Sequence, residues 1–379
     1  MRAARTLWLY LVREALQYAG IGFFAVSGVL IAQNLLRRLE DLAGLGVRPS
    51  DVLELVWALF LMLSSYAVPV AFLFGILVAV GRLSSDSEIT AMRSVGVSFG
   101  QILLPFVLVA LGVGALTGHL LAESGPSARR QLRALAGHIA ARGGLIEAGR
   151  FNELDRQGSR LLFADDRDEK GQLAGVLIAD HSDPQNPFTV LAEHGHFAFD
   201  ERTGRAQLVL RNGDIHFTPP SPEAKSYRRI AFGVFRYSFE LGDLFGASAD
   251  RIRPSEMTTP EVRDVLSRFQ ADDKPPPGIR IKTRERYEIQ IHRRIALAAA
   301  PLLFALVGVP LGLRRTRGAR SLGSLLCAAL VFGYYMLLSA GTFLAEQHRL
   351  PASVALWIPN VIFTGLALGL DLRASRAGI

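Results

Sequence analysis

The feature that most limits the fold of this chain is a set of six long runs without Asp, Glu, Lys or Arg. A helix needs about 20 apolar residues to cross the hydrocarbon core of a membrane, and each run reaches or approaches that length. Half of the 379 residues are hydrophobic, and the mean hydropathy is +0.27. The sequence therefore predicts six transmembrane helices, at Ala15–Leu36, Leu55–Gly81, Ser94–Ala122, Ile295–Leu313, Ser321–Ala345 and Leu350–Leu370.

Proline and glycine punctuate these runs. Neighbouring helices can compensate for a proline inside a membrane bundle, but Pro351 and Pro359 leave the start of the sixth helix uncertain. Gly-x-x-x-Gly pairs let helices approach closely. Four such pairs favour tight packing, within the chain or with a partner: Gly96/Gly100, Gly114/Gly118, Gly308/Gly312 and Gly365/Gly369.

Arginine in the short loops predicts the orientation, because cytoplasmic loops carry an excess of positive charge. One side holds eleven Arg in its termini and short loops and the other side four. Both termini are therefore expected in the cytoplasm, and the long insert between the third and fourth helices outside it. The basic segment Arg280–Arg294 opposes this assignment, but long translocated domains are largely exempt from the rule. The net charge of +8 thus favours a membrane partner over nucleic acid.

The insert has a different character. From Leu145 to Leu241 short runs of β-forming residues alternate with turns, which predicts an all-β sandwich or jelly roll. Predicted strands are Ser159–Ala164, Leu173–Asp180, Thr189–His194, Gly195–Phe199, Ala206–Arg211, Gly213–Phe217 and Ile230–Phe239, with turns that include Asn212-Gly213. Cys327 is the single cysteine, so no disulfide can form within the chain. The predicted domains are 1–122 (three helices), 123–280 (the β domain with flanking helices) and 281–379 (three helices).

No catalytic motif is present. The chain has no Walker A, HExxH or GxSxG sequence, and its apolar runs hold no carboxylate that could relay protons. His194 and His196 lie at i, i+2 on one predicted strand face, where partial solvation is a simpler interpretation than a metal pair. We expect no catalytic site, no metal site and no cofactor bound by this chain.

The loop between the second and third helices is the most informative short segment. Ser85 or Ser87 can cap a short helix, with Asp86 and Glu88 near its positive end. Leu83, Ile89 and Met92 would form one apolar edge. The pattern fits a short interfacial helix that docks a carboxylate into a cytoplasmic partner, and it fits equally a solvated loop on the lipid headgroups.

Several segments resemble one known family, the lipopolysaccharide export permeases of the LptF/LptG type. The loop Gly81-Arg-Leu-Ser-Ser-Asp-Ser-Glu-Ile-Thr-Ala-Met-Arg-Ser-Val-Gly-Val-Ser98 is similar to the coupling-helix segment of that family, at about 83–96 here. Gly149-Arg-Phe-Asn-Glu-Leu154, Leu191-Ala-Glu-His-Gly195 and Leu208-Val-Leu-Arg-Asn-Gly213 resemble strand motifs of its periplasmic β-jellyroll. Pro310-Leu-Gly-Leu-Arg-Arg-Thr-Arg-Gly-Ala-Arg-Ser-Leu-Gly323 resembles its loop between the fourth and fifth helices. The resemblance covers nearly the whole chain and leans towards LptF.

The resemblance implies a subunit of an ABC transporter in the bacterial inner membrane. Such permeases pair with a paralogue (LptG type), bind a cytoplasmic ATPase dimer (LptB type) that holds ATP and Mg²⁺, and pass lipopolysaccharide to periplasmic bridge proteins (LptC/LptA type). It implies an ATPase-coupling role for a set around Glu88, namely Asp86, Glu88, Ile89, Met92 and Arg93. It implies lipid-phosphate contacts at Arg37 and Arg38, with Asn34 at the position one turn earlier where some relatives carry a basic residue.

Other functions are also compatible with parts of the sequence. A permease for another lipid or for lipoprotein would share this topology. A membrane-anchored periplasmic sensor would usually carry a cytoplasmic output domain, and the longest cytoplasmic segment here is a short loop. An intramembrane enzyme would need buried nucleophiles, carboxylates or metal ligands that the runs do not contain.

Overall fold

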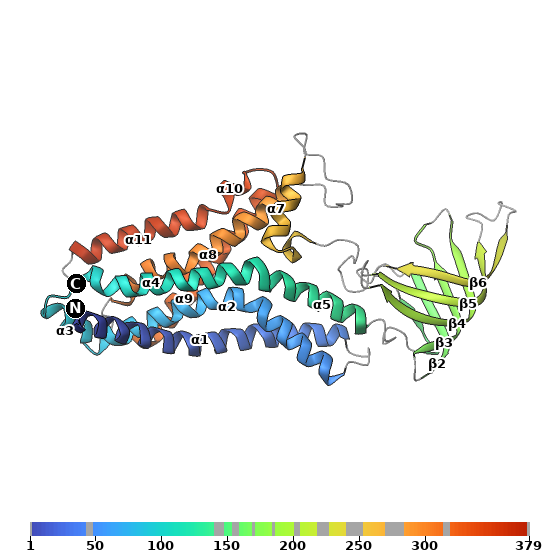
Figure 1. Cartoon of the computed structure of the whole chain (residues 1–379), viewed down its shortest axis with the longest axis horizontal. Coiled ribbons are helices and arrows are strands. Elements are labelled where there is room, and N and C mark those ends of the chain that lie inside the picture. The colour runs from blue at the N-terminus through green and yellow to red at the C-terminus, as the bar shows by residue number, and fades with distance from the viewer. Residues whose placement is uncertain are drawn as a thin grey trace. The chain divides into compact units, whose positions relative to one another are not determined.

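The computed structural model describes eleven segments of the chain: residues 2–42, 48–139, 148–153, 159–168, 171–183, 186–200, 205–217, 227–239, 253–269, 284–313 and 319–376. They form two compact units. The helical unit contains Met1–Gln33, Leu59–Arg129 and Arg253–Ile379, and the second unit contains Asn34–Ala58 and Arg130–Ile252. The second unit contains the six-stranded sheet (Figure 1).

All six predicted spans are helices long and apolar enough to cross a membrane. The first three are α1 (Arg2–Leu42), α2 (Pro49–Ser85) and α4 (Phe99–His119). The other three are α8 (Arg284–Gly312), α9 (Ala319–Glu346) and α11 (Ile358–Arg376), the last preceded by the short α10 (Ala352–Ala355). Helices α1, α2 and α9 extend beyond their uncharged runs at both ends, because apolar length sets the part that can lie in lipid and not the part that can be helical.

The prolines lie inside helices or at helix starts. Pro69 and Pro105 lie inside α2 and α4 without ending them. Pro351 stands immediately before α10, and Pro359 is the second residue of α11, where the missing N–H leaves no helical hydrogen bond unmade. The sixth predicted span therefore begins as two helical pieces.

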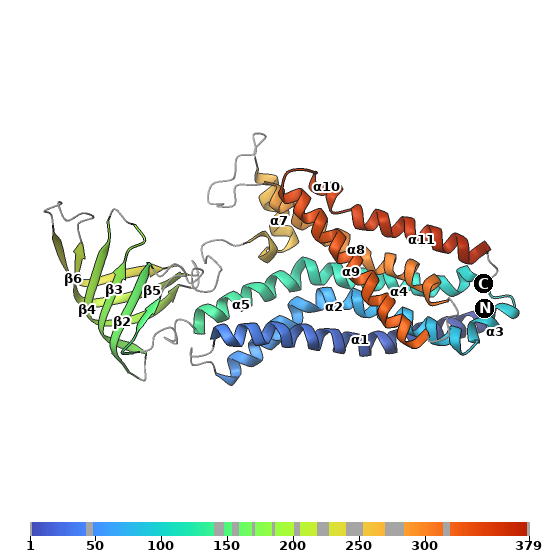
Figure 2. The same cartoon turned by 180° about the vertical axis from the view of Figure 1, so that it is seen from behind.

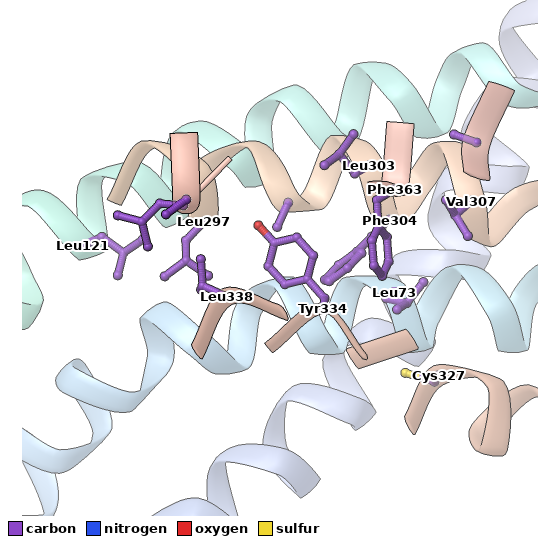
Figure 3. Packing of buried hydrophobic residues seen from close by; sticks show 14 of the residues in the cluster. Leu73, Leu121, Leu297, Leu303, Phe304, Val307, Cys327, Tyr334, Leu338 and Phe363 are labelled. Carbon is purple, nitrogen blue, oxygen red and sulfur yellow. The ribbon is translucent and has the colours of Figure 1, made fainter. Parts of the chain in front are cut away.

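Helices α2 and α8 form the centre of the helical unit. In their most apolar windows 72% and 67% of the residues are buried, against 22–39% in the other four spans. Phe304 of α8 and Tyr334 of α9 pack edge to face at 5.3 Å, and Phe363 of α11 packs against both rings (Figure 3). The Tyr334 hydroxyl lies 2.8 Å from Oδ1 of Asn360 and 3.0 Å from the carbonyl oxygen of Ala296, so this buried polar group is satisfied.

Two of the four predicted glycine pairs lie where helices touch. Gly308 and Gly312 face Leu73, Ile76 and Val80 of α2, and Gly114 and Gly118 face Ala298 of α8. A Cβ atom on Gly114 would lie 2.7 Å from the carbonyl oxygen of Ala298, too close for a side chain. A Cβ atom added to Gly96, Gly100, Gly365 or Gly369 would meet no heavy atom of the described chain within 4 Å. The packing prediction is therefore confirmed for two of the four pairs.

Helix α4 continues outward instead of stopping at the predicted end of the third run. One π-helical turn, η1 (Leu120–Ser124), joins it to α5 (Gly125–Ile139). The predicted helical continuation after Ala122 is thus confirmed over the described residues. On the return path a 3₁₀ turn, η3 (Pro254–Glu256), precedes α7 (Thr259–Arg268), and the Thr258 N–H donates to the Glu261 carboxylate at 2.7 Å.

The described strands form one antiparallel sheet in the order β1-β2-β3-β4-β5-β6. Each strand pairs with its neighbour in the sequence. The strands are β1 (Phe151–Glu153), β2 (Arg160–Arg167), β3 (Gln172–Asp180), β4 (Phe188–Asp200), β5 (Arg205–Phe217) and β6 (Arg228–Phe239). The predicted all-β character of the insert is confirmed.

The predicted strand number is wrong at two places. Thr189–His194 and Gly195–Phe199 are one strand, β4, and Ala206–Arg211 and Gly213–Phe217 are one strand, β5. Asn212-Gly213 makes no turn, because β4 runs alongside it, with Ala192 opposite Gly213 and His194 opposite Arg211. Asn212 adopts φ 53, a left-handed conformation that Asn tolerates, and Gly213 leaves room for the backbone of β4.

Candidate functional site

The short helix α3 (Glu88–Ser94) lies between α2 and α4. It is at the end of the helical unit where α1 begins and α11 ends (Figures 1 and 2). A residue with a left-handed backbone conformation flanks α3 on each side, Ser87 at φ 63 and Gly96 at φ 89. Ser98 then starts α4, and its hydroxyl accepts the Gln101 N–H at 3.3 Å while Gln101 returns a bond to the Ser98 N–H.

The predicted cap of α3 differs in detail. Ser87 is the residue before the helix, but its side chain makes no capping hydrogen bond. The Ser85 hydroxyl instead donates to the carbonyl oxygen of Arg82 in the last turn of α2. The backbone turn at Ser87 therefore starts α3 without a side-chain cap.

The predicted apolar edge of α3 is confirmed. Leu83 and Ile89 are buried, and Met92 packs against the same hydrophobic cluster. That cluster also holds Leu11 of α1 and Ile102 of α4. The opposite face is open: Val95, just after α3, is 79% exposed, and Asp86, Thr90, Ala91 and Ser94 are exposed. This segment is an anchored helix with an accessible surface.

Charged side chains around α3 bind one another. Oε2 of Glu88 accepts a hydrogen bond from the Tyr10 hydroxyl at 2.8 Å. Arg82 forms an ion pair with Glu14 of α1 and another, at 3.3 Å, with Asp86. Nη1 of Arg93 is buried and has no hydrogen-bond partner within the described segments. The structure thus brings all five predicted coupling residues into one segment and adds Tyr10, Glu14 and Arg82, which sequence reasoning missed.

The predicted lipid-phosphate residues are described less fully. Asn34, Arg37 and Arg38 all lie in α1, and Asn34 is half-buried. The side chains of Arg37 and Arg38 lie outside the described part of the structure.

A second basic site lies in the helical unit, in a pocket of about 180 Å³. Its walls come from α2, η1, α5, η3 and α8. They are Ser65, Tyr66, Leu121, Gly125, Pro126, Arg129, Ser255, Gln290, Arg293, Arg294 and Leu297. We call this the arginine pocket. Three guanidinium groups meet here, and the residues that line it include no carboxylate.

Two of the three arginines are fixed by backbone oxygens. Arg294 is 7% exposed, and it donates to the Thr259 hydroxyl at 2.8 Å and to the carbonyl oxygen of Met257 at 2.6 Å. Arg129 donates to the carbonyl oxygen of Ser255 at 2.9 Å. Nε of Arg293 is buried and has no hydrogen-bond partner among the described residues. No carboxylate lines the pocket, although the charge of Glu261 acts on Arg294, so three positive charges lie close together.

The depth of the arginine pocket follows from helix geometry. Tyr66 lies 19 residues before the end of α2 at Ser85, and Arg293 lies 19 residues before the end of α8 at Gly312. At 1.5 Å per residue each is about 28 Å from the end of its helix. The hydrocarbon core of a bilayer is about 30 Å thick. If these ends mark one face of the membrane, the pocket lies at headgroup level on the other face.

A signal for the arginine pocket was present in the sequence. The basic segment Arg280–Arg294 precedes the fourth span, and its charge opposes the predicted orientation. Arg293 and Arg294 lie within it, at the start of an otherwise apolar run, where a charge is costly unless it has a function or a partner.

The edges of the sheet are a third candidate surface. In the described part of the chain β6 pairs only with β5, and Ile230 and Val234 of β6 are 51% and 60% exposed. An open edge strand can accept a strand from another protein.

The sequence matches a protein family described as lipopolysaccharide export system permease LptF/LptG, over residues 9–373. Relatives include the lipopolysaccharide export system permease protein LptF of Escherichia coli strain K12 and that of Shigella flexneri. Each is 23% identical over 367 residues, which cover 96% of this chain and 93% of the relative. Six apolar helices, an inserted antiparallel sheet and the anchored helix α3 agree with this match. The chain therefore belongs to the LptF/LptG family of lipopolysaccharide export permeases.

Proposed function

We propose that this chain is one of two paralogous permease subunits that extract lipopolysaccharide from the inner membrane and pass it to a periplasmic bridge of jellyroll proteins. A separate cytoplasmic ATPase dimer supplies the energy and holds the ATP and Mg²⁺. The chain itself acts without a catalytic site or a cofactor of its own.

The observation that carries this proposal is the build of α3. Its buried edge joins α1, α2 and α4 in one hydrophobic cluster, so a force applied to α3 reaches three spans. Its outer face, with Asp86 and Val95, is free to dock on a partner. We assign the ATPase-coupling role to Asp86, Glu88, Ile89, Met92 and Arg93, with Glu88 as the carboxylate that meets the ATPase.

The orientation is supported by charge. The end of the helical unit that carries α3 also holds the start of α1 and the end of α11 (Figure 1). The excess of Arg in the termini and loops assigned to this side places it in the cytoplasm. The sheet is then periplasmic, and its open edges suit strand addition by the bridge proteins.

The substrate side is supported by the basic residues near the opposite end. Lipid A carries phosphates, and guanidinium groups bind phosphate with two parallel hydrogen bonds. Asn34, Arg37 and Arg38 are one proposed contact site. The arginine pocket is a second, because it gathers Arg129, Arg293 and Arg294 and no carboxylate lines it.

The runner-up is a permease for another lipid or for a lipoprotein, which would use the same topology and the same α3. The phosphate chemistry favours a phosphorylated glycolipid. A sensor is disfavoured because the described cytoplasmic segment is the short α3 region.

Glu88→Ala tests the proposal in complexes purified from native membranes. We expect the variant to fold and to insert, to retain much less ATPase subunit, and to release no lipopolysaccharide to an acceptor in proteoliposomes. Glu346→Ala, an exposed glutamate at the end of α9, is the matched control. Normal ATP hydrolysis and normal lipid release by Glu88→Ala would contradict the coupling role, and mass spectrometry of lipid bound to the unaltered complex identifies the substrate.

A further inference from the structure

We propose that Tyr10 is a positioning residue, which holds the Glu88 carboxylate ready for the ATPase and ties α1 to the docking helix α3. The inference rests on the proposed coupling role of Glu88. It adds a residue from the first span, 78 positions earlier in the chain, to the machinery that couples ATP hydrolysis to movement.

The first contact is the hydrogen bond itself. The Tyr10 hydroxyl donates to Oε2 of Glu88 over 2.8 Å. No other hydrogen bond of Glu88 is found among the described residues, so Oε1 remains free to accept from a basic side chain of the ATPase. A carboxylate held through one oxygen and free at the other is preorganised for a partner, because the side chain has already lost its rotamer freedom.

A second contact lies one helical turn along α1. Glu14 follows Tyr10 by four residues, which places both on the same face of the helix. Glu14 is 8% exposed and forms an ion pair with Arg82 of α2, which also pairs with Asp86 before α3. Tyr10 and Glu14 therefore bind the α3 region at two separate points.

Apolar packing holds the same surfaces together. Leu11 and Ala15 of α1 share a buried cluster with Ile89 of α3. Gly75 of α2 lets the two backbones approach, because a Cβ atom there would lie 2.7 Å from the backbone nitrogen of Ala19. Further along α1, Phe23 packs edge to face against Phe60 of α2 at 5.9 Å.

This distribution gives Tyr10 its role. Helix α1 is bound to α3 by Tyr10 and by the shared buried cluster, so a displacement of α3 carries the start of α1 with it. The other end of the same helix bears Asn34, Arg37 and Arg38. Tyr10 thus does two things at once: it aims Glu88 at the ATPase, and it links that contact to the span that carries the proposed lipid site.

A purely structural hydrogen bond would stabilise the fold without acting through Glu88. The two roles differ in a double-mutant cycle, because two groups that act through one contact lose their effect together. The cycle compares Tyr10→Phe, Glu88→Ala and the double variant in the full complex of both permeases in nanodiscs. The dissociation constant of the ATPase subunit is measured at concentrations high enough to saturate the Glu88→Ala complex.

We expect Tyr10→Phe to raise that dissociation constant about fivefold and to slow ATP-driven lipid release, with the thermal midpoint of the complex unchanged. In the Glu88→Ala background the same change should have no further effect. Tyr227→Phe removes a hydroxyl that contacts His216 in the β unit, and it should leave binding and release unaltered.

The outcomes separate the inference from the proposed function. A Glu88→Ala variant with an unchanged dissociation constant would overturn the coupling role itself. If Glu88→Ala weakens binding but Tyr10→Phe does not, or if Tyr10→Phe weakens it equally in both backgrounds, only the role of Tyr10 is overturned.

Discussion

The helical unit carries two clusters of charge, and they are built in opposite ways. Around α3, Arg82 lies between two carboxylates, and Glu88 is bound by Tyr10. In the arginine pocket Arg129, Arg293 and Arg294 converge, and none of them pairs with a carboxylate of the described residues. In the first cluster arginine and carboxylates compensate one another, whereas no carboxylate lines the second.

The difference between the two charge clusters indicates a different role for each end of the helical unit. Charges that satisfy one another cost little and fix the positions of helices. Charges that repel one another in a half-buried pocket cost stability and persist where an external anion compensates them. We therefore expect the cluster at α3 to transmit force and the arginine pocket to bind an anionic ligand.

The strongest test of this comparison reverses the charge in the paired cluster. Arg82→Glu removes the cation between Glu14 and Asp86 and adds a carboxylate beside them. Because like charges then face one another, we expect about tenfold less ATPase to be retained by the purified permease pair, and a lower thermal midpoint. Arg373→Glu, an exposed reversal on α11, makes the same change in net charge and should do neither. Equal retention in the two variants would show that the paired cluster does not matter for docking.

The same reversal in the arginine pocket should act in the opposite direction on stability. Arg293→Glu gives Arg129 and Arg294 a carboxylate, so the thermal midpoint of the chain in detergent should rise by about 2 °C. Binding of phosphorylated lipid A should weaken about tenfold, the effect of losing one charge-assisted phosphate contact. Dephosphorylated lipid A should bind the variant and the unaltered chain alike.

Arg286→Glu, an exposed position on the same helix, is the matched control. A pocket that only stabilises the fold would behave differently: Arg293→Glu would change the thermal midpoint and leave the preference for phosphorylated lipid intact.

The smallest effect on stability is expected in the sheet. There Asp180 is a carboxylate that pairs with Arg160, and it lies outside the membrane-spanning helices. Burial on its own raises the pKa of Asp180, but hydrogen bonds from Ser182 and Tyr237 and the charge of Arg160 outweigh it, so the pKa is lowered. A carboxyl with a lowered pKa stabilises the fold above its unfolded pKa, and this contribution disappears as the pH falls through the folded value.

We therefore expect β3 and β6 of the full chain to exchange amide hydrogens faster at pH 3 than at pH 7, after correction for intrinsic rates. Asp180→Asn should remove most of that pH dependence. Tyr237→Phe should cost about 1.5 kcal/mol, the value of a hydrogen bond to a charged group. An unchanged pH dependence in Asp180→Asn would assign the effect to another carboxyl.

The spans and the β insert could be predicted from the sequence because each depends on local pattern. The length of an uncharged run decides whether a helix can cross a membrane, and alternation in segments such as Gln207–Arg211 decides that a strand forms. Asn212-Gly213 shows the limit. Its turn chemistry is strong, but pairing with β4 on one side and β6 on the other overrides it, and that pairing is not visible in a single segment.

The candidate site was predictable to the same extent. The apolar spacing of Leu83, Ile89 and Met92 predicted which edge of α3 is buried. The bond from Tyr10 to Glu88 could not be predicted, because it depends on how α1 crosses α2 at Gly75. The arginine pocket needs five elements from distant parts of the sequence, and a count of charges records Arg129 and Arg293 without showing that they meet.

The order of strands in the sheet has a consequence for how the insert folds. Each strand pairs with the one made just before it, so every closure of the chain is short and loses little entropy. Topologies with such low contact order fold quickly. The insert has no cysteine to lock it, and it can therefore assemble one hairpin at a time, each new strand covering the open edge of the strand before it.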